Sequence, residues 1–238
     1  MTEVRVALSP DIDRYLDSLV RSGAFANKAE LVRAALVSFT SQAGPIAQGF
    51  DRENQLAPDG RVYQLEYARE ASLRGLPGVG VVFDGGVILA AAAPQGKLVR
   101  GLPKIRRLAD RLAVLASGLV GDAHMAVVRL REAKPKTTEE AVDILVRFYW
   151  EHSVDRSKRP LAAGLLVASA LDGGGRLFYV DPSSAVVEYD AVAVGEGSEE
   201  MTEILEKRYR RGAAREAERL ALEILGRPEK AEVVRVPA

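Results

Sequence analysis

Few side chains in this sequence have the type and spacing that catalysis or metal binding requires. The chain has no cysteine, which excludes a disulfide framework, a thiolate metal site and a cysteine nucleophile. Its histidines, His124 and His152, are too few for a histidine cage, so we expect no metal site and no cofactor. The glycine-rich stretches at 84–86 and 172–175 lack the Gly-Lys-Ser/Thr ending of a phosphate-binding loop and predict hairpin turns.

The composition predicts a soluble cytoplasmic protein with one large core. Hydrophobic residues make up 47% of the 238 residues, enough for a sizeable domain and a small appended one. The 33 basic and 33 acidic residues balance, so no net field favours nucleic acid or an acidic membrane. We see no secretory signal and no apolar run near the roughly 20 residues of a membrane helix, and we expect no membrane partner.

The first part of the chain predicts a strand followed by two helices. Residues 2–8 alternate between apolar and other side chains, which is typical of a strand with one buried face. A helix is expected from Ser9 to Gly23, and a second helix begins near Asn27. These elements fill only residues 1–43, and chains this small usually need a partner to bury their apolar faces.

This order, with SGAFANKAELVRAAL across the turn between the helices, resembles a ribbon-helix-helix domain. The resemblance implies pairing of two chains through their strands and contact of outward strand residues with DNA, for which Arg5 is the candidate. Residues 1–43 contain five basic and five acidic side chains, so phosphate attraction is weak. DNA contact and dimerisation without DNA both stay open.

The rest of the sequence predicts an α+β fold after a linker at 44–57. Blocks of strands and helices alternate along it, which favours sheets between helical layers. Strands are expected within 78–93, 107–119, 161–195 and 231–236, and helices at 121–133, 137–152, 197–210 and 213–226.

Several motifs in this part resemble those of proteasome α-type subunits of the archaeal kind. The most specific is PDGRVYQLEYAREA at 58–71, followed by SGLVGDA at 117–123, KRP at 158–160 and the segment at 176–200. The resemblance covers about residues 50–236. It implies a four-layer αββα Ntn-hydrolase sandwich over 58–238, and a helix after Pro58 that lies between neighbouring subunits of a ring. Periodicity alone also allows that helix to fold on its own core.

The same resemblance implies a chain that is not an enzyme. Catalytic β-type relatives attack the peptide carbonyl with an N-terminal threonine. Leu76 occupies that position here, and Ala92 occupies the position of the supporting acid. Lys104 aligns with the catalytic lysine, but a lysine without a nucleophile or an acid does no chemistry. We therefore expect no catalytic residue.

Two groups of residues correspond to binding positions of the family. Lys104 would accept the C-terminal carboxylate of a regulatory ATPase in a pocket with Glu66, Gly75 and Leu119, although it could also be a solvated surface lysine. The gate-like cluster matches Phe50, Asp51, Pro58 and Tyr67. Phe50 replaces the family's tyrosine and lacks the hydroxyl that makes a hydrogen bond worth about 1 kcal/mol.

Two functions follow from these observations. In the first, the chain is a non-catalytic α-type subunit whose homo-oligomeric ring, or paired rings, controls entry to a chamber formed with β-type subunits. In the second, it is a divergent α-like protein that self-assembles through residues 1–43 and acts as a regulatory or DNA-associated protein. The added N-terminal domain and the short connection at 131–140 depart from the family pattern and keep the second hypothesis open.

Overall fold

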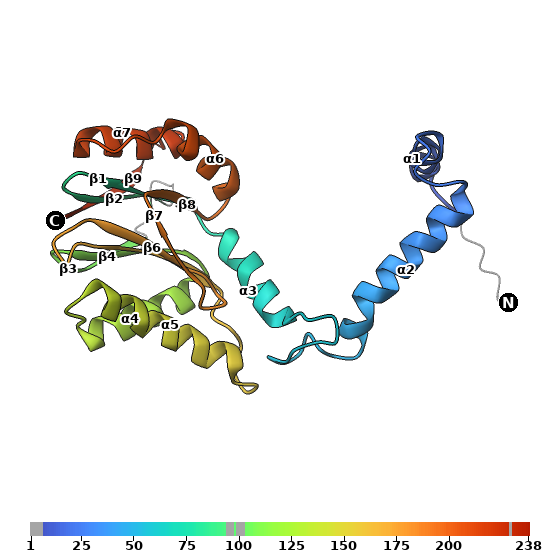
Figure 1. Cartoon of the computed structure of the whole chain (residues 1–238), viewed down its shortest axis with the longest axis horizontal. Helices are drawn as coiled ribbons and strands as arrows, with labels where there is room; N and C mark the ends of the chain where they lie inside the picture. The colour runs from blue at the N-terminus through green and yellow to red at the C-terminus, as the bar shows by residue number, and fades with distance from the viewer. Residues whose placement is uncertain (1–6, 94–97, 99–102, 229) are drawn as a thin grey trace.

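The computed structural model describes residues 7–93, 98, 103–228 and 230–238 (Figure 1). The strand expected at 2–8 and the candidate DNA contact Arg5 lie almost wholly outside the described residues. Residues 7–9 precede the first helix without regular structure. The strand of the expected N-terminal domain therefore stays a prediction.

Two antiparallel sheets stack face to face between two pairs of helices, which gives the four layers expected from the sequence (Figure 1). One sheet has the order β8-β1-β2-β9, and the other has the order β3-β4-β5-β6-β7. The strands are β1 Gly78–Phe83, β2 Gly86–Ala92, β3 Ile105–Ala109, β4 Leu112–Gly118, β5 Ala163–Ser169, β6 Arg176–Val180, β7 Val186–Tyr189, β8 Ala191–Val194 and β9 Ala231–Pro237. The outer helices are α4 Val120–Ala133, α5 Thr138–Val154, α6 Ser198–Arg208 and α7 Ala214–Ile224.

Three apolar layers hold these four structural layers together. Alternate residues of strand β2 contribute to two of these apolar layers. Val87 and Leu89 face the other sheet, whereas Ile88 faces α6 and α7. The third layer lies between β4, β5 and β6 and the helices α4 and α5, where Tyr149 is fully buried and its hydroxyl donates to the Ala163 carbonyl at 2.8 Å. Strands buried on both faces explain the nearly continuous apolar runs in the sequence.

The helices α1 (Pro10–Arg21) and α2 (Lys28–Ala47) extend away from the sandwich (Figure 1). They are joined by the Lys28 ammonium, which forms ion pairs with Asp13 at 2.6 Å and Asp17 at 2.9 Å. In the described residues, Leu16 of α1 and Leu31 of α2 are the buried apolar side chains of this pair. No helix in the described part of the chain is long and apolar enough to cross a membrane.

The linker expected at 44–57 is wrong at its start, because α2 continues to Ala47 through Gly44 and Pro45. A proline near the end of a helix removes one backbone hydrogen bond, which the last turn can lose without breaking. The connection to α3 (Tyr63–Leu73) is correspondingly short.

The turn between β1 and β2 offers a test of the fold, because it leaves no room for a side chain at Gly86. This glycine has φ +140°, and a Cβ atom there would lie 2.0 Å from the Val236 carbonyl oxygen of β9. We expect Gly86→Ala to lower the free energy of unfolding by about 2 kcal/mol or more. Gly174→Ala is the matched control, since nothing lies within 4 Å of its added Cβ. Equal urea midpoints for the two variants would contradict the close approach of β9.

Candidate functional site

The end of the sandwich next to α3 contains some of the residues that the sequence singled out. Here α3 ends, β1 begins and β4 ends in close contact. The Ser117 hydroxyl of β4 donates to the Ser72 carbonyl at 2.9 Å, and the Glu196 amide donates to the Gly75 carbonyl at 2.9 Å. A Cβ atom on Gly75 would lie 2.5 Å from the Gly118 nitrogen, so only glycine fits this contact.

The segment that leads into β1 is formed by small and apolar residues after Arg74. Leu76 lies two residues before the strand and is 44% exposed, and residues 74–78 contain no hydroxyl or thiol. The nearby hydroxyls of Ser72 and Ser117 are buried and donate to backbone carbonyls, not to a general base.

Lys104 directly precedes β3 and has a buried side-chain nitrogen. Its backbone amide donates to the Glu232 carboxylate at 2.7 Å, and the Ile105 amide donates to the same oxygen at 3.0 Å. The Nζ atom has no hydrogen-bond partner among the residues that the structure describes. Burial lowers the pKa of the Lys104 ammonium to about 8, and the Glu232 carboxylate offsets part of this shift. The alternative of a solvated surface lysine is therefore wrong.

The residues predicted to share a pocket with Lys104 lie partly together. Leu119 follows Gly118 and is 46% exposed, so it borders the contact made by Gly75. Lys104 lies at the same end of β4, because Ile105 pairs with Leu115. Glu66 is farther away along α3, where it forms a 3.6 Å ion pair with Arg61.

The residues of the expected gate-like cluster lie in the segment between α2 and α3 and on α3 itself. The Gln64 side chain of α3 donates to the Asp51 carbonyl. Tyr67 is 45% exposed, and burial of its hydroxyl with the nearby charge of Asp51 raises its pKa. Phe50 is half-buried and supplies no hydroxyl, whereas Pro58 lies in the turn that precedes α3.

Two contacts that fix this end of the molecule were not expected from the sequence. Arg69 of α3 forms a 2.9 Å ion pair with Asp181 and donates to the Ser183 hydroxyl at 2.7 Å. Farther along, the Asn54 amide nitrogen is bonded to three carbonyls at the end of α5. No local pattern indicates either contact, since the partners are separated by about a hundred residues. The carbonyls belong to His152, Asp155 and Lys158, at 2.7, 3.0 and 2.9 Å.

The fold is a layered α+β sandwich of two antiparallel sheets between two pairs of helices. The family model described as "Proteasome subunit" matches residues 73–231. The chain belongs to the proteasome subunit family.

Among the curated proteins that the chain matches are several named as α subunits. The chain is 37% identical over 166 residues to "Proteasome subunit alpha" of Methanocaldococcus jannaschii, covering 65% of this chain and 64% of that protein. It is 35% identical over 178 residues to "Proteasome subunit alpha 2" of Haloarcula marismortui, covering 69% and 73%. The corresponding protein of Archaeoglobus fulgidus is 37% identical over 175 residues, covering 68% and 71%. The chain thus matches about two thirds of the length of these relatives.

The buried Lys104 predicts a pH-dependent stability that a neutral side chain would remove. Below pH 8 this lysine is charged in both the folded and unfolded states, so its burial cost is fully present. The cost falls as pH rises from about 8 to the ordinary value of 10.5. We expect Lys104→Met to raise the free energy of unfolding by roughly 2 kcal/mol at pH 7 and by much less at pH 10. Urea denaturation at both pH values measures this, and a difference that does not change with pH would contradict it.

The Asn54 contact predicts local opening of the segment between α2 and α3 when the amide is removed. Asn54→Ala would leave carbonyls at the end of α5 without their donor, which costs about 1–3 kcal/mol. Hydrogen exchange in residues 49–57 should then become at least about tenfold faster. Gln55→Ala is the control, because the Gln55 side chain makes a single long hydrogen bond of 3.4 Å to Gly49. Equal exchange in the two variants would show that Asn54 does not hold the segment.

Proposed function

We propose that this chain is a non-catalytic structural α-type subunit of a proteasome-like core particle, with an Ntn-hydrolase type of sandwich. Its ring would control the entry of substrates to a proteolytic chamber that β-type subunits complete. The observation that carries this proposal is α3, a helix fixed across the end of the sandwich directly before a strand that begins without a nucleophile. The names of the curated relatives support the same assignment.

The exposed side of α3 supports a role in assembly. Tyr67 is 45% exposed and Leu73 is 37% exposed, although the helix is anchored to the sandwich by Arg69. Leu76, just beyond the helix, is also 44% exposed. Apolar side chains left uncovered on an anchored helix indicate contact with a neighbouring subunit.

Lys104 would take part in docking a regulatory ATPase. A buried ammonium without a partner in the described residues is costly, and a carboxylate from another chain would offset that cost. Gly75 and Leu119 would border this pocket, and Glu66 would complete it from α3. Phe50, Asp51, Pro58 and Tyr67 would then act as the gate-like cluster, with one hydrogen bond missing at Phe50.

Co-expression with an archaeal β-type subunit, followed by native mass spectrometry, tests the proposal. We expect a complex that contains both chains, in which a threonine-directed covalent inhibitor labels the β-type chain alone. Purified without that partner, this chain should form a ring and remain unlabelled. Failure to form a ring, or inhibitor bound to this chain, would overturn the proposal.

The second candidate function is self-assembly through α1 and α2, which one observation favours. Apolar side chains on α2 recur at spacings of four, three and seven residues and share one face of the helix. All are exposed, although helices of this length are usually stabilised by burial of such a face. A second copy of the same face would cover it, and Arg5, the candidate DNA contact, lies outside the described residues. The residues are Val32, Leu36, Phe39 and Ile46, with exposed fractions of 39, 55, 67 and 40%.

A charge on this face should prevent the pairing. We expect Leu36→Asp combined with Phe39→Asp to halve the mass of any paired assembly, because carboxylates cannot be buried without partners. Ala34→Asp is the control, since Ala34 is exposed on the opposite face of α2. Sedimentation velocity measures the mass. If the double variant keeps the wild-type mass, α2 does not pair through this face.

A further inference from the structure

Three backbone carbonyl oxygens converge on one point at the end of α5. They lie 2.7, 3.0 and 2.9 Å from the Asn54 Nδ2 atom and belong to His152, Asp155 and Lys158. A side-chain amide carries two N–H protons, so it cannot donate to all three carbonyls at once. The Asp155 carbonyl also has a second donor, the Lys158 backbone amide at 3.1 Å. The convergence of the three oxygens therefore exceeds what hydrogen bonding by Asn54 requires.

The Asn54 side chain also carries a buried acceptor without a donor. Asn54 is only 7% exposed, and its Oδ1 atom has no hydrogen-bond partner in the described part of the chain. Folded proteins rarely leave a buried acceptor in this state, because the loss of its contact with water is then not offset. This oxygen and the three carbonyls together place four oxygen atoms at the end of α5.

The end of α5 favours a positive charge. His152 lies in the last turn of α5, where a helix leaves carbonyl groups without intrahelical donors and its dipole is negative. The Lys158 ammonium is held by the Asp155 carboxylate at 3.4 Å, and Arg156 is exposed. Residues 155–159 are half-buried or exposed, so an ion can reach the carbonyls from the surface.

The spacing of the carbonyls selects a large monovalent cation. A cation in the place of Nδ2 would lie 2.7–3.0 Å from the three oxygens. Ca²⁺ prefers about 2.3–2.6 Å and Mg²⁺ about 2.0–2.1 Å, and both favour carboxylates. The described residues contain no group of three or more His, Cys, Asp or Glu that could hold a metal ion. Neutral carbonyl oxygens replace the water shell of K⁺ in channels, and such backbone ligands leave no side-chain pattern in a sequence.

We infer that the three carbonyls and Asn54 Oδ1 form a K⁺ site that links the segment between α2 and α3 to the end of α5. The ion takes the place of the amide nitrogen, while the amide withdraws and turns its Oδ1 atom toward the ion. All four oxygens then have a partner. The segment can shift to allow this, because residues 48–53 and 55–56 are exposed or half-buried. The inference does not depend on the formation of a ring.

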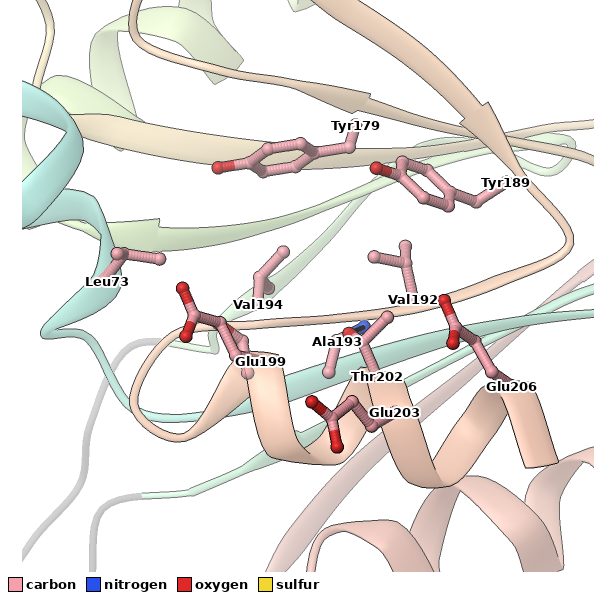
Figure 2. Close-up of a pocket in the computed structure, with 11 residues that line it drawn as sticks. Leu73, Tyr179, Tyr189, Val192, Ala193, Val194, Glu199, Thr202, Glu203 and Glu206 are labelled. Carbon is pink, nitrogen blue, oxygen red and sulfur yellow. Dashed lines mark hydrogen bonds between the residues drawn. The ribbon is translucent and has the colours of Figure 1, made fainter. Parts of the chain in front are cut away.

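An acidic groove on one flank of the sandwich is the competing place for a cation (Figure 2). It has a volume of about 430 Å³ between α6 and the strands β7 and β8, and α6 contributes Glu199, Glu203 and Glu206 to it. These three residues are exposed, so water already solvates their carboxylates and a bound cation gains little. The buried Asn54 Oδ1 lacks such solvation, which favours the end of α5.

Hydrogen exchange of the full-length chain in KCl and in tetramethylammonium chloride, at equal ionic strength, tests the site. Tetramethylammonium is too large to enter between the carbonyls. We expect K⁺ to slow exchange in residues 49–57 at least about threefold, because a bound ion stabilises the closed segment. NaCl should slow it less, since a smaller ion does not contact all the oxygens at this spacing. Exchange that is as slow in either other salt as in KCl would overturn the inference.

Two variants of Asn54 separate ion binding from hydrogen bonding by the amide. Asn54→Asp supplies two oxygens and no N–H donor, so we expect K⁺ to slow exchange in residues 49–57 at least about tenfold. Asn54→Leu keeps a similar volume without an oxygen, and the effect of K⁺ should disappear. An effect in Asn54→Leu as large as in the wild type would place the ion elsewhere and contradict the site.

Crystals soaked in RbCl locate the ion directly, because Rb⁺ is close to K⁺ in size and scatters anomalously. We expect a peak between the three carbonyls in the wild type and none in Asn54→Leu. Glu203→Gln with Glu206→Gln is the control for the acidic groove and should keep both the peak and the effect of K⁺. Thermal unfolding verifies the fold of each variant. A wild type without the peak, or a groove variant without the K⁺ effect, would refute the inference and leave the proposed function untouched.

Discussion

Each of the two sheets is buried on both faces, and this constraint determines which surfaces are left for other molecules. One face of each sheet packs against the other sheet, and the second face packs against a helix pair. Only the ends of the strands, the sheet edges and the outer helix faces remain. The features with functional potential accordingly lie at the end near α3 and at the flanks that carry β3 and β9 or β7 and β8.

The sequence was sufficient to predict the elements that burial and turns impose. Continuous apolar runs at 78–93 and 161–195 predicted strands buried on both faces, and the structure confirms strands in both segments. The glycines at 85–86 marked the tight turn between β1 and β2. The predicted start of the linker at residue 44 was wrong. Gly44 and Pro45 indicate a break in a helix, but the last turn of α2 tolerates both residues. The local sequence pattern does not show whether the last turn of a helix will form when one of its backbone hydrogen bonds is missing.

The residues of the candidate site could be named from the sequence, but their burial, pKa values and close contacts could not. The resemblance pointed to Lys104, whereas its burial and its lowered pKa depend on the fold around β3 and β9. Gly75 was likewise named in advance, and the reason that it must be glycine is a contact with Gly118 on another strand. The ion pair between Arg69 and Asp181 joins distant segments, so no spacing in the sequence could indicate it.

The Asn54 contact limits the reach of α1 and α2. Gly49 closes α2 with a hydrogen bond to Ile46, and Asn54 is already fastened to the end of α5. Five residues of chain span about 17 Å at most. A molecule held by α1 and α2 would therefore stay within reach of this short tether and the 20-residue helix α2, which raises its local concentration around the sandwich.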